Sequence, residues 1–307
     1  MPKPRSIILI AVFIFLFAAT LIGFLVYQRQ KLSSALLSPL AQLPPEFAEV
    51  LSESTSSAQT ASSPSPTLTP FDTRSEVTGN FTIAILGDSM VDTLGDLSLI
   101  KNQLNQTYPN VNFKLLNYGI GSTNAASGLK RLTESSVRQN QTLPPLLTQN
   151  PDLILIESFA YNHAANTPED LNNHENTLNQ SIQTIRNSLP SDILLLTTIS
   201  PNLEFYAIGA PGINWSNQQR KSEAETVLAY LKITSELAKK SNIPQVDAAT
   251  SSQDSSGNGK RIFIESTTNI HPSPEGIELI SGLISQKIVD LGIIDNKLPK
   301  DTTVLDF

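Results

Sequence analysis

The sequence has 307 residues, a formal charge of −7 and no cysteine. The length suits one or two domains, and the absence of a clustered basic patch excludes a typical nucleic-acid-binding surface. The absence of cysteine also excludes disulfides, thiolate catalysis and cysteine-based metal sites. Histidine chemistry is restricted to His163, His174 and His271.

Residues 6–27 form an uncharged apolar run with basic residues close to both of its ends. A helix over this run would be about 33 Å long, which is enough to cross the hydrocarbon core of a bilayer. A cleaved signal peptide would have a shorter apolar region followed by a small-residue cleavage site. Because the run is long and basic residues follow it at once, we expect an uncleaved transmembrane anchor within residues 1–31.

Residues 32–78 are rich in Ser, Thr and Pro and poor in large apolar side chains. Such a segment buries too little apolar surface to fold and is typical of a flexible linker. An anchor followed by a linker predicts a domain held off a membrane surface. We therefore expect a single-pass cell-membrane protein that contacts the membrane through its N-terminal helix and whose folded domain is extracytoplasmic.

Strand-like and helix-like segments alternate in the folded domain, which we place at residues 79–295, with residues 296–307 as a C-terminal tail. The predicted strands are residues 82–86, 112–117, 153–157, 193–199 and 245–247. The predicted helices are residues 96–107, 123–132, 168–188, 216–240 and 274–291. Ser216 with Gln219 is typical of a capping box, and Ser273 is a good N-cap before Pro274. The alternation predicts an α/β fold with a parallel sheet and helices on both faces.

Polar motifs follow the first two predicted strands. The first strand ends in Gly87-Asp88-Ser89, and ligands of open α/β sheets bind outside the carboxyl ends of the strands. Ser89 therefore lies where it could react with a bound ligand, although Ser and Asp are also ordinary turn residues. The second strand is followed by a segment with Gly119 and Gly121, where backbone N–H groups can approach a ligand closely.

Two further polar residues come after later strands. Asn162 follows the third strand, and an Asn side chain can donate to a developing oxyanion, although it is more often a turn residue. His271 precedes Pro272 and the last predicted helix, where a C-terminal loop can bring a histidine to a serine far away in sequence. Glu157, at the end of a buried strand, either pairs with a nearby polar group or lines a pocket.

Taken together and in this order, Gly87-Asp88-Ser89, the glycine segment, Asn162 and His271-Pro272 resemble the SGNH (GDSL-type) hydrolase family of serine esterases and acyl hydrolases. The resemblance covers about residues 81–291 and implies a three-layer α/β/α flavodoxin-like sandwich with a mainly parallel sheet. It implies that Ser89 is the nucleophile and His271 the general base. It also implies an oxyanion hole made of the Ser89 backbone N–H, a backbone N–H at Gly121 or Ser122, and the Asn162 side chain.

The resemblance implies no cofactor, and neither His163 nor His174 has metal-ligand partners at useful spacing, so we expect no metal. The chain departs from the family pattern at Thr268, where an Asp usually stands three residues before the histidine. Glu265, a backbone carbonyl, or no third group at all could replace that Asp in orienting the imidazole, and the first two are equally good candidates. Ser122 also stands where Gly is common, and the neighbours of Asn162 are not typical.

Three functions fit these observations. The first is a membrane-tethered ester hydrolase with an acyl-enzyme intermediate, acting on an acylated envelope glycan or a lipid ester. The second is an O-acyltransferase with the same residues, in which a sugar hydroxyl replaces water. The third is a non-catalytic SGNH-like binding domain, which the missing Asp makes credible. In each case Phe205, Tyr206 and Trp215, on the long loop after the fourth strand, either shape a ligand site or cover the edge of the core.

Overall fold

The computed structural model describes residues 72–301. The expected anchor at residues 6–27 and most of the expected linker lie outside the described residues. Among the helices between residues 72 and 301, none is both long and apolar enough to cross a membrane.

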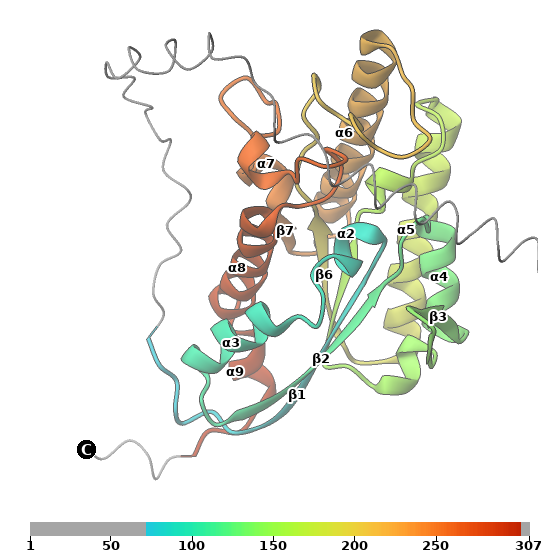
Figure 1. The fold of residues 1–307 in the computed structure, drawn as a ribbon. Coiled ribbons are helices and arrows are strands. Elements are labelled where there is room, and N and C mark those ends of the chain that lie inside the picture. Colours follow the sequence, from blue (N-terminus) through green and yellow to red (C-terminus); the bar gives the residue numbers. More distant parts are fainter. Residues whose placement is uncertain (1–71, 302–307) are drawn as a thin grey trace, which may run out of the picture. The chain divides into compact units, whose positions relative to one another are not determined.

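The centre of the fold is a five-stranded parallel sheet with the strand order β2-β1-β5-β6-β7 (Figure 1). This is the order of a flavodoxin-like doubly wound sheet. The five predicted strands and the mainly parallel sheet are thus confirmed. A separate antiparallel hairpin, which the sequence did not predict, joins β3 to β4. The strands are β1 Gly79–Gly87, β2 Val111–Gly119, β3 Ser136–Arg138, β4 Gln141–Leu143, β5 Leu153–Glu157, β6 Asp192–Thr197 and β7 Gln245–Asp247.

The five long helices begin and end close to the predicted residues. The capping box is present, because Ser216 accepts from the Gln219 N–H and the Gln219 side chain accepts from the Ser216 N–H. Ser273 caps the last long helix by accepting from the Gly276 N–H. The α-helices are α2 Ser89–Asp92, α3 Ser98–Thr107, α4 Ala125–Thr133, α5 Pro168–Ser188, α6 Asn217–Lys240, α7 Ala248–Ser251, α8 Pro274–Asp290 and α9 Ile293–Lys297, and the 3-10 turns are η2 Leu146–Gln149, η3 Ala160–Asn162 and η4 Arg261–Phe263.

The two faces of the sheet carry separate apolar clusters. Along β1, Ile83 and Ile85 belong to the cluster with side chains of α3 and α8, whereas Ala84 and Leu86 belong to the cluster with α4 and α5. Figure 1 shows α3 and α8 on one side of the sheet and α4 and α5 on the other. Because both faces are buried, the strands are continuous apolar runs rather than alternating ones.

The ends of the folded region pair with each other slightly beyond residues 79–295. Val77 forms an antiparallel bridge with Lys300, and α9 extends to Lys297. At the other edge of the sheet, strand register brings the functional loops together. Gly87 of β1 is level with Gly119 of β2, and Leu86 of β1 is level with Ile156 of β5. The loops that follow these three strands are therefore neighbours in space.

Candidate active site

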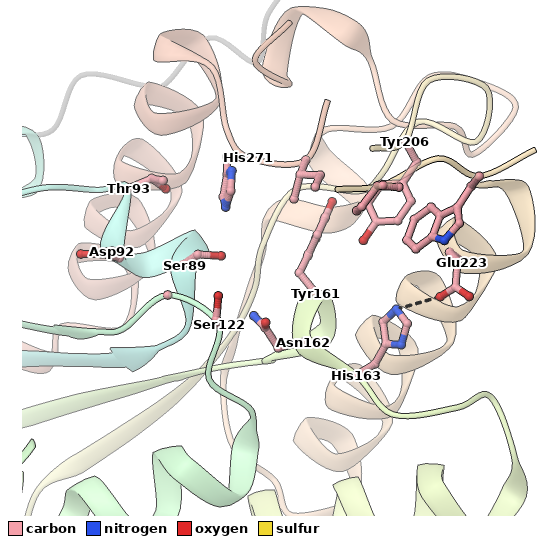
Figure 2. A pocket seen from close by; sticks show the side chains of 14 residues that line it. Ser89, Asp92, Thr93, Ser122, Tyr161, Asn162, His163, Tyr206, Glu223 and His271 are labelled. Carbon is pink, nitrogen blue, oxygen red and sulfur yellow. Dashed lines mark ion pairs between the residues drawn. The ribbon is translucent and has the colours of Figure 1, made fainter. Parts of the chain in front are cut away.

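A cavity of about 710 Å³ opens at the carboxyl edge of the sheet (Figure 2). Of the six residues predicted for the catalytic set and the oxyanion hole, all but Glu265 line it, although they come from loops far apart in the chain. The lining residues are Ser89, Asp92, Thr93, Gly121, Ser122, Tyr161, Asn162, His163, Tyr206, Ile213, Trp215, Glu223, Ile270 and His271.

Ser89 is the first residue of α2, immediately after β1. The Asp88 carboxylate caps this short helix by accepting from the Met90 N–H at 2.8 Å. A Cβ on Gly87 would lie 2.3 Å from Val91 Cγ2 and 2.9 Å from Glu157 Cβ, so the tight turn requires glycine. The half-buried Ser89 side chain consequently faces the cavity (Figure 2).

Hydrogen-bond donors for an oxyanion lie around Ser89. Within residues 72–301, no hydrogen bond uses the backbone N–H of Ser89, Gly121 or Ser122. Asn162 Nδ2 donates to Asp88 Oδ2 at 2.8 Å, which leaves its second N–H for a ligand. Ser122 adopts a left-handed conformation with φ of 58° directly after Gly121. The loops thus provide three free backbone donors and one oriented amide, so the structure leaves both Gly121 and Ser122 open as the second backbone donor.

Three ionisable side chains are buried beneath the Ser89 end of the cavity. Asp88 and Glu157 are both fully buried, and Arg131 is almost so. Burial raises the pKa of Asp88 to about 6, against the opposing effects of the hydrogen bonds from Met90 and Asn162 and of the Arg131 charge. Burial and then the Asp88 charge hold the pKa of Glu157 well above its usual range. Burial lowers the pKa of Arg131 to about 10.

Glu157 does not line the cavity. Its carboxylate accepts from the Phe159 N–H at 2.8 Å and from the Ser158 hydroxyl at 2.5 Å. Phe159 is in the left-handed region with φ of 53° and is the N-cap of η3, which ends at Asn162. Of the two roles left open by the sequence, Glu157 therefore has the pairing role, and it holds the turn that presents Asn162.

Hydrogen bonds hold the backbone at His271, whereas its imidazole ring makes none within the described residues. The Glu265 N–H donates to the His271 carbonyl at 2.9 Å, and Pro272 forms a bridge with Ile264. In the described part of the chain, the His271 ring makes no hydrogen bond. Burial lowers the pKa of His271 below 6.5, although the charges of Glu265 and then Asp92 act to raise it. The imidazole is therefore neutral at neutral pH, as a general base must be.

The Glu265 carboxylate is held by its own loop. It accepts from the Thr268 hydroxyl, from the Thr268 N–H at 2.9 Å and from the Thr267 N–H at 2.7 Å. Burial acts to raise its pKa, but these hydrogen bonds outweigh burial, so the pKa is lowered and Glu265 is ionised. No hydrogen bond between residues 72 and 301 joins Glu265 to the His271 ring, so its effect on the ring is through its charge.

Asp92 is a second carboxylate beside His271, and no motif in the sequence indicates its role. Arg138, from the β3–β4 hairpin, pairs with Asp92 Oδ1 through Nε at 2.8 Å and through Nη2 at 2.7 Å. Arg138 also donates to the Gly119 carbonyl at 3.1 Å. The hairpin therefore connects α2 to the glycine segment, a contact between residues 46 positions apart that leaves no local sequence signal.

The other end of the cavity is mainly aromatic. The Tyr206 and Trp215 rings are stacked, with centroids 6.2 Å apart and planes at 26°. Phe205 does not line the cavity, because it packs under the Arg261 guanidinium at 4.0 Å. His163 Nε2 lies 3.8 Å from Glu223 Oε2. Glu223 was missed because nothing distinguishes it in sequence from the other acidic residues of α6.

A family model described as GDSL-like lipase/acylhydrolase matches residues 83–284. The chain belongs to this family. The protein is accordingly an enzyme that hydrolyses esters, and the SGNH-type resemblance is confirmed. A comparison with curated proteins gives no match.

Solved structures with a similar fold come from several bacteria, each at low sequence identity. A lipase/acylhydrolase from Enterococcus faecalis is 20% identical over 72% of this chain and 98% of its own, with a TM-score of 0.49. An acetylxylan esterase from Geobacillus stearothermophilus is 16% identical over 69% and 96%, with a TM-score of 0.49. A GDSL-like lipase from Bacteroides thetaiotaomicron is 15% identical over 68% and 88%, also with a TM-score of 0.49.

The contact between Asp88 and Asn162 predicts a catalytic defect for Asp88→Asn. Asp88 accepts from the Met90 N–H and from Asn162 Nδ2 through different oxygens, whereas an asparagine has only one acceptor oxygen. With that oxygen on the Met90 N–H, which the backbone of α2 fixes, the new NH₂ group faces Asn162 Nδ2, so Asn162 must turn and withdraw its donor from the cavity. Loss of one oxyanion donor lowers kcat roughly 100-fold. Steady-state kinetics with a soluble acetyl ester measure this effect. Asp96→Asn, which makes the same change at the exposed start of α3, should leave kcat unchanged, and an unchanged kcat in Asp88→Asn would contradict the role given to Asp88.

Proposed function

We propose that the protein is a serine esterase in which Ser89 is the nucleophile and His271 the general base. One observation carries this proposal: three kinds of group line the same cavity. They are the half-buried Ser89 hydroxyl, the neutral His271 imidazole, which makes no hydrogen bond within the described residues, and the backbone N–H groups of Ser89 and Gly121, which have no acceptor there. This set satisfies the requirements for acyl transfer: a nucleophile, a base and fixed oxyanion donors.

The reaction proceeds in two halves. Ser89 Oγ attacks the ester carbonyl carbon while His271 takes the hydroxyl proton, and the oxyanion accepts hydrogen bonds from the Ser89 and Gly121 N–H groups and from Asn162. The carbon–oxygen bond to the alcohol then breaks, and His271 gives its proton to the leaving alkoxide. Water attacks the acyl-enzyme by the same route in reverse, which releases the acid and restores Ser89.

We propose that Glu265 replaces the missing Asp of the family pattern through its charge rather than through a hydrogen bond. Two carboxylates stabilise the His271 imidazolium, Glu265 more than Asp92. The charge of Asp92 is already paired with Arg138. Hydrogen bonds from Thr267 and Thr268 keep Glu265 ionised. Thr268 stands where the family usually has Asp, and its hydroxyl thus orients the Glu265 carboxylate, which takes over the role of that Asp.

We further propose that the enzyme is tethered to the cell membrane by a helix at residues 6–27 and acts outside the cytoplasm. The support is the length and apolar character of that run and the Ser/Thr/Pro-rich segment that follows it. An acylated envelope glycan or a lipid ester is a substrate class within reach of such a tether.

The first test is hydrolysis of p-nitrophenyl acetate. Ser89→Ala and His271→Ala should each lower kcat roughly 1,000-fold or more, because a nucleophile and its base act as a unit. Ser98→Ala, on the exposed start of α3, is the matched control and should keep the wild-type rate. Equal rates for Ser89→Ala and wild type would refute the nucleophile assignment, and product formed only with an added glycan acceptor would establish acyl transfer instead.

The pH profile tests Glu265. Activity should be lost as the pH falls through the lowered pKa of His271, because protonation removes the base. Glu265→Gln removes a charge that raises this pKa, so the acidic limb should move to lower pH. The plateau of kcat should fall roughly tenfold, because the imidazolium of the transition state loses a stabilising charge.

The comparison variant for this measurement is Glu278→Gln, on the exposed side of α8. It should change neither the limb nor the plateau. If Glu265→Gln also leaves both unchanged, the carboxylate does not act on His271, and a backbone carbonyl or no third group at all takes the place of the usual Asp.

Fractionation of cells tests the tether. The full chain should sediment with membranes and resist extraction by alkaline carbonate, as an inserted helix does. A variant that lacks residues 1–31 should be recovered in the soluble fraction. Protease added to intact spheroplasts should release the domain by cutting within residues 32–78. Full-length chain in the soluble fraction, or a domain protected from external protease, would contradict the proposed location.

A further inference from the structure

The cavity is larger than an acyl group at Ser89 needs. Its volume of about 710 Å³ is within the range of roughly 300–1,000 Å³ that holds a drug-sized ligand. Figure 2 shows Ser89 and Ser122 toward one end, and Tyr206, His163 and Glu223 toward the other, with Tyr161 between. We call the second end, defined by Tyr161, His163, Tyr206, Trp215 and Glu223, the aromatic subsite.

The position of His271 determines which way the ester lies in this cavity. The imidazole returns its proton to the leaving oxygen, so the alcohol part of the ester must lie on the His271 side of the carbonyl. Ile270, adjacent to His271, also lines the cavity. The loop that carries Tyr206 lies against the same segment, because the Asn269 side chain donates to the Ile208 carbonyl at 3.0 Å. The alcohol part therefore points into the aromatic subsite.

The subsite has one aromatic wall. The Tyr206 and Trp215 rings are stacked with their planes at 26°, and the Tyr161 ring is tilted 58° to Tyr206, with the two centroids 6.0 Å apart. Trp215 is half-buried, and its backbone carbonyl accepts from Arg220 at 2.8 Å, which holds the end of the loop on α6. A fixed aromatic surface of this kind favours a flat partner that can lie across it.

The polar groups beside this wall are hydrogen-bond acceptors. His163 Nδ1 lies 2.6 Å from the Ala164 carbonyl oxygen, so Nδ1 carries a proton, and in that tautomer Nε2 is an acceptor. The Glu223 carboxylate, 3.8 Å from Nε2, is beyond hydrogen-bond distance. These two acceptors leave room for donors from a ligand, which hydroxyl groups supply and an alkyl chain does not.

We propose that the aromatic subsite binds a sugar ring as the alcohol part of the ester, with the ring face on Trp215 and its hydroxyls donating to Glu223 and His163. This inference rests on the proposed function, because it takes the ester carbonyl to be at Ser89. A pyranose combines a flat apolar face with hydroxyls on its rim. A cationic alcohol such as choline also suits aromatic rings with a carboxylate, but a quaternary ammonium has no N–H or O–H to donate to Glu223 and His163, whereas sugar hydroxyls do.

Binding can be measured separately from catalysis, because Trp215 is the only tryptophan of the chain. The full chain with Ser89→Ala should show a saturable change in tryptophan fluorescence when titrated with a monoacetylated methyl pyranoside. Adding Glu223→Gln should weaken this binding roughly tenfold through loss of a charged acceptor. Adding Glu225→Gln, on the exposed side of the same helix, should not. Absence of any fluorescence change at millimolar sugar ester would overturn the proposal.

Turnover by the enzyme with Ser89 intact separates the alcohol classes. In a pH-stat, kcat/KM for the acetylated pyranoside should exceed that for methoxyethyl acetate roughly tenfold or more, and Trp215→Leu should remove the preference. Phe205→Leu, a loop aromatic outside the cavity, should keep it. Equal values for the two esters, or a preference for acetylcholine, would overturn the sugar assignment. Sugar binding with no hydrolysis of any ester would support the subsite and refute the esterase mechanism.

Discussion

The hydrogen bond from Asn162 to the Asp88 carboxylate is the contact on which the rest of the candidate site depends. It joins the loops after β1 and β5, which are adjacent because these strands pair in parallel. Burial of a carboxylate costs on the order of several kcal/mol, and the rise of the Asp88 pKa to about 6 reflects this cost. The same carboxylate caps α2 at Met90, so one buried group fixes both the helix that begins at Ser89 and the amide that faces it.

Hydrogen bonds hold the side chains of Asp88 and Asn162, whereas at His271 they hold only the backbone and leave the ring without a partner among the described residues. A general base must exchange its proton with two partners in turn, and a strong hydrogen bond within the protein would compete with them. In the role proposed for Glu265, a charge at a distance stabilises the imidazolium without occupying a ring nitrogen. On that proposal the chain dispenses with the usual Asp because the Thr268 hydroxyl and N–H hold the Glu265 carboxylate instead of contacting the ring.

The sequence predicted what depends on local pattern. Residues 82–86 and 153–157 could be recognised as strands because burial on both faces makes them continuous apolar runs, and the first residues of α6 and α8 could be placed from their N-caps. The contact of Arg138 with Asp92 could not be predicted, because the hairpin has no periodic signal. Tertiary packing alone decides which way a side chain of a helix or strand faces. The sequence therefore could not show that Glu157 pairs beneath the cavity, or that Glu223 lines the cavity while Glu225 faces solvent.

The two ends of the cavity are formed by different parts of the fold, so the proposed reaction and the proposed choice of substrate depend on different residues. Ser89, Gly121 and Asn162 follow directly from the ends of β1, β2 and β5, whose positions are fixed by the sheet register. Tyr206 and Trp215 belong to the loop of residues 202–215, in which Ala207 is left-handed with φ of 59°, while Glu223 is on α6. On the proposal that the aromatic subsite holds the alcohol part of the ester, substitutions in this loop change the alcohol that is accepted without disturbing the contact between Asp88 and Asn162. Family membership determines the ester chemistry, and the proposal assigns the choice of ester to the loop.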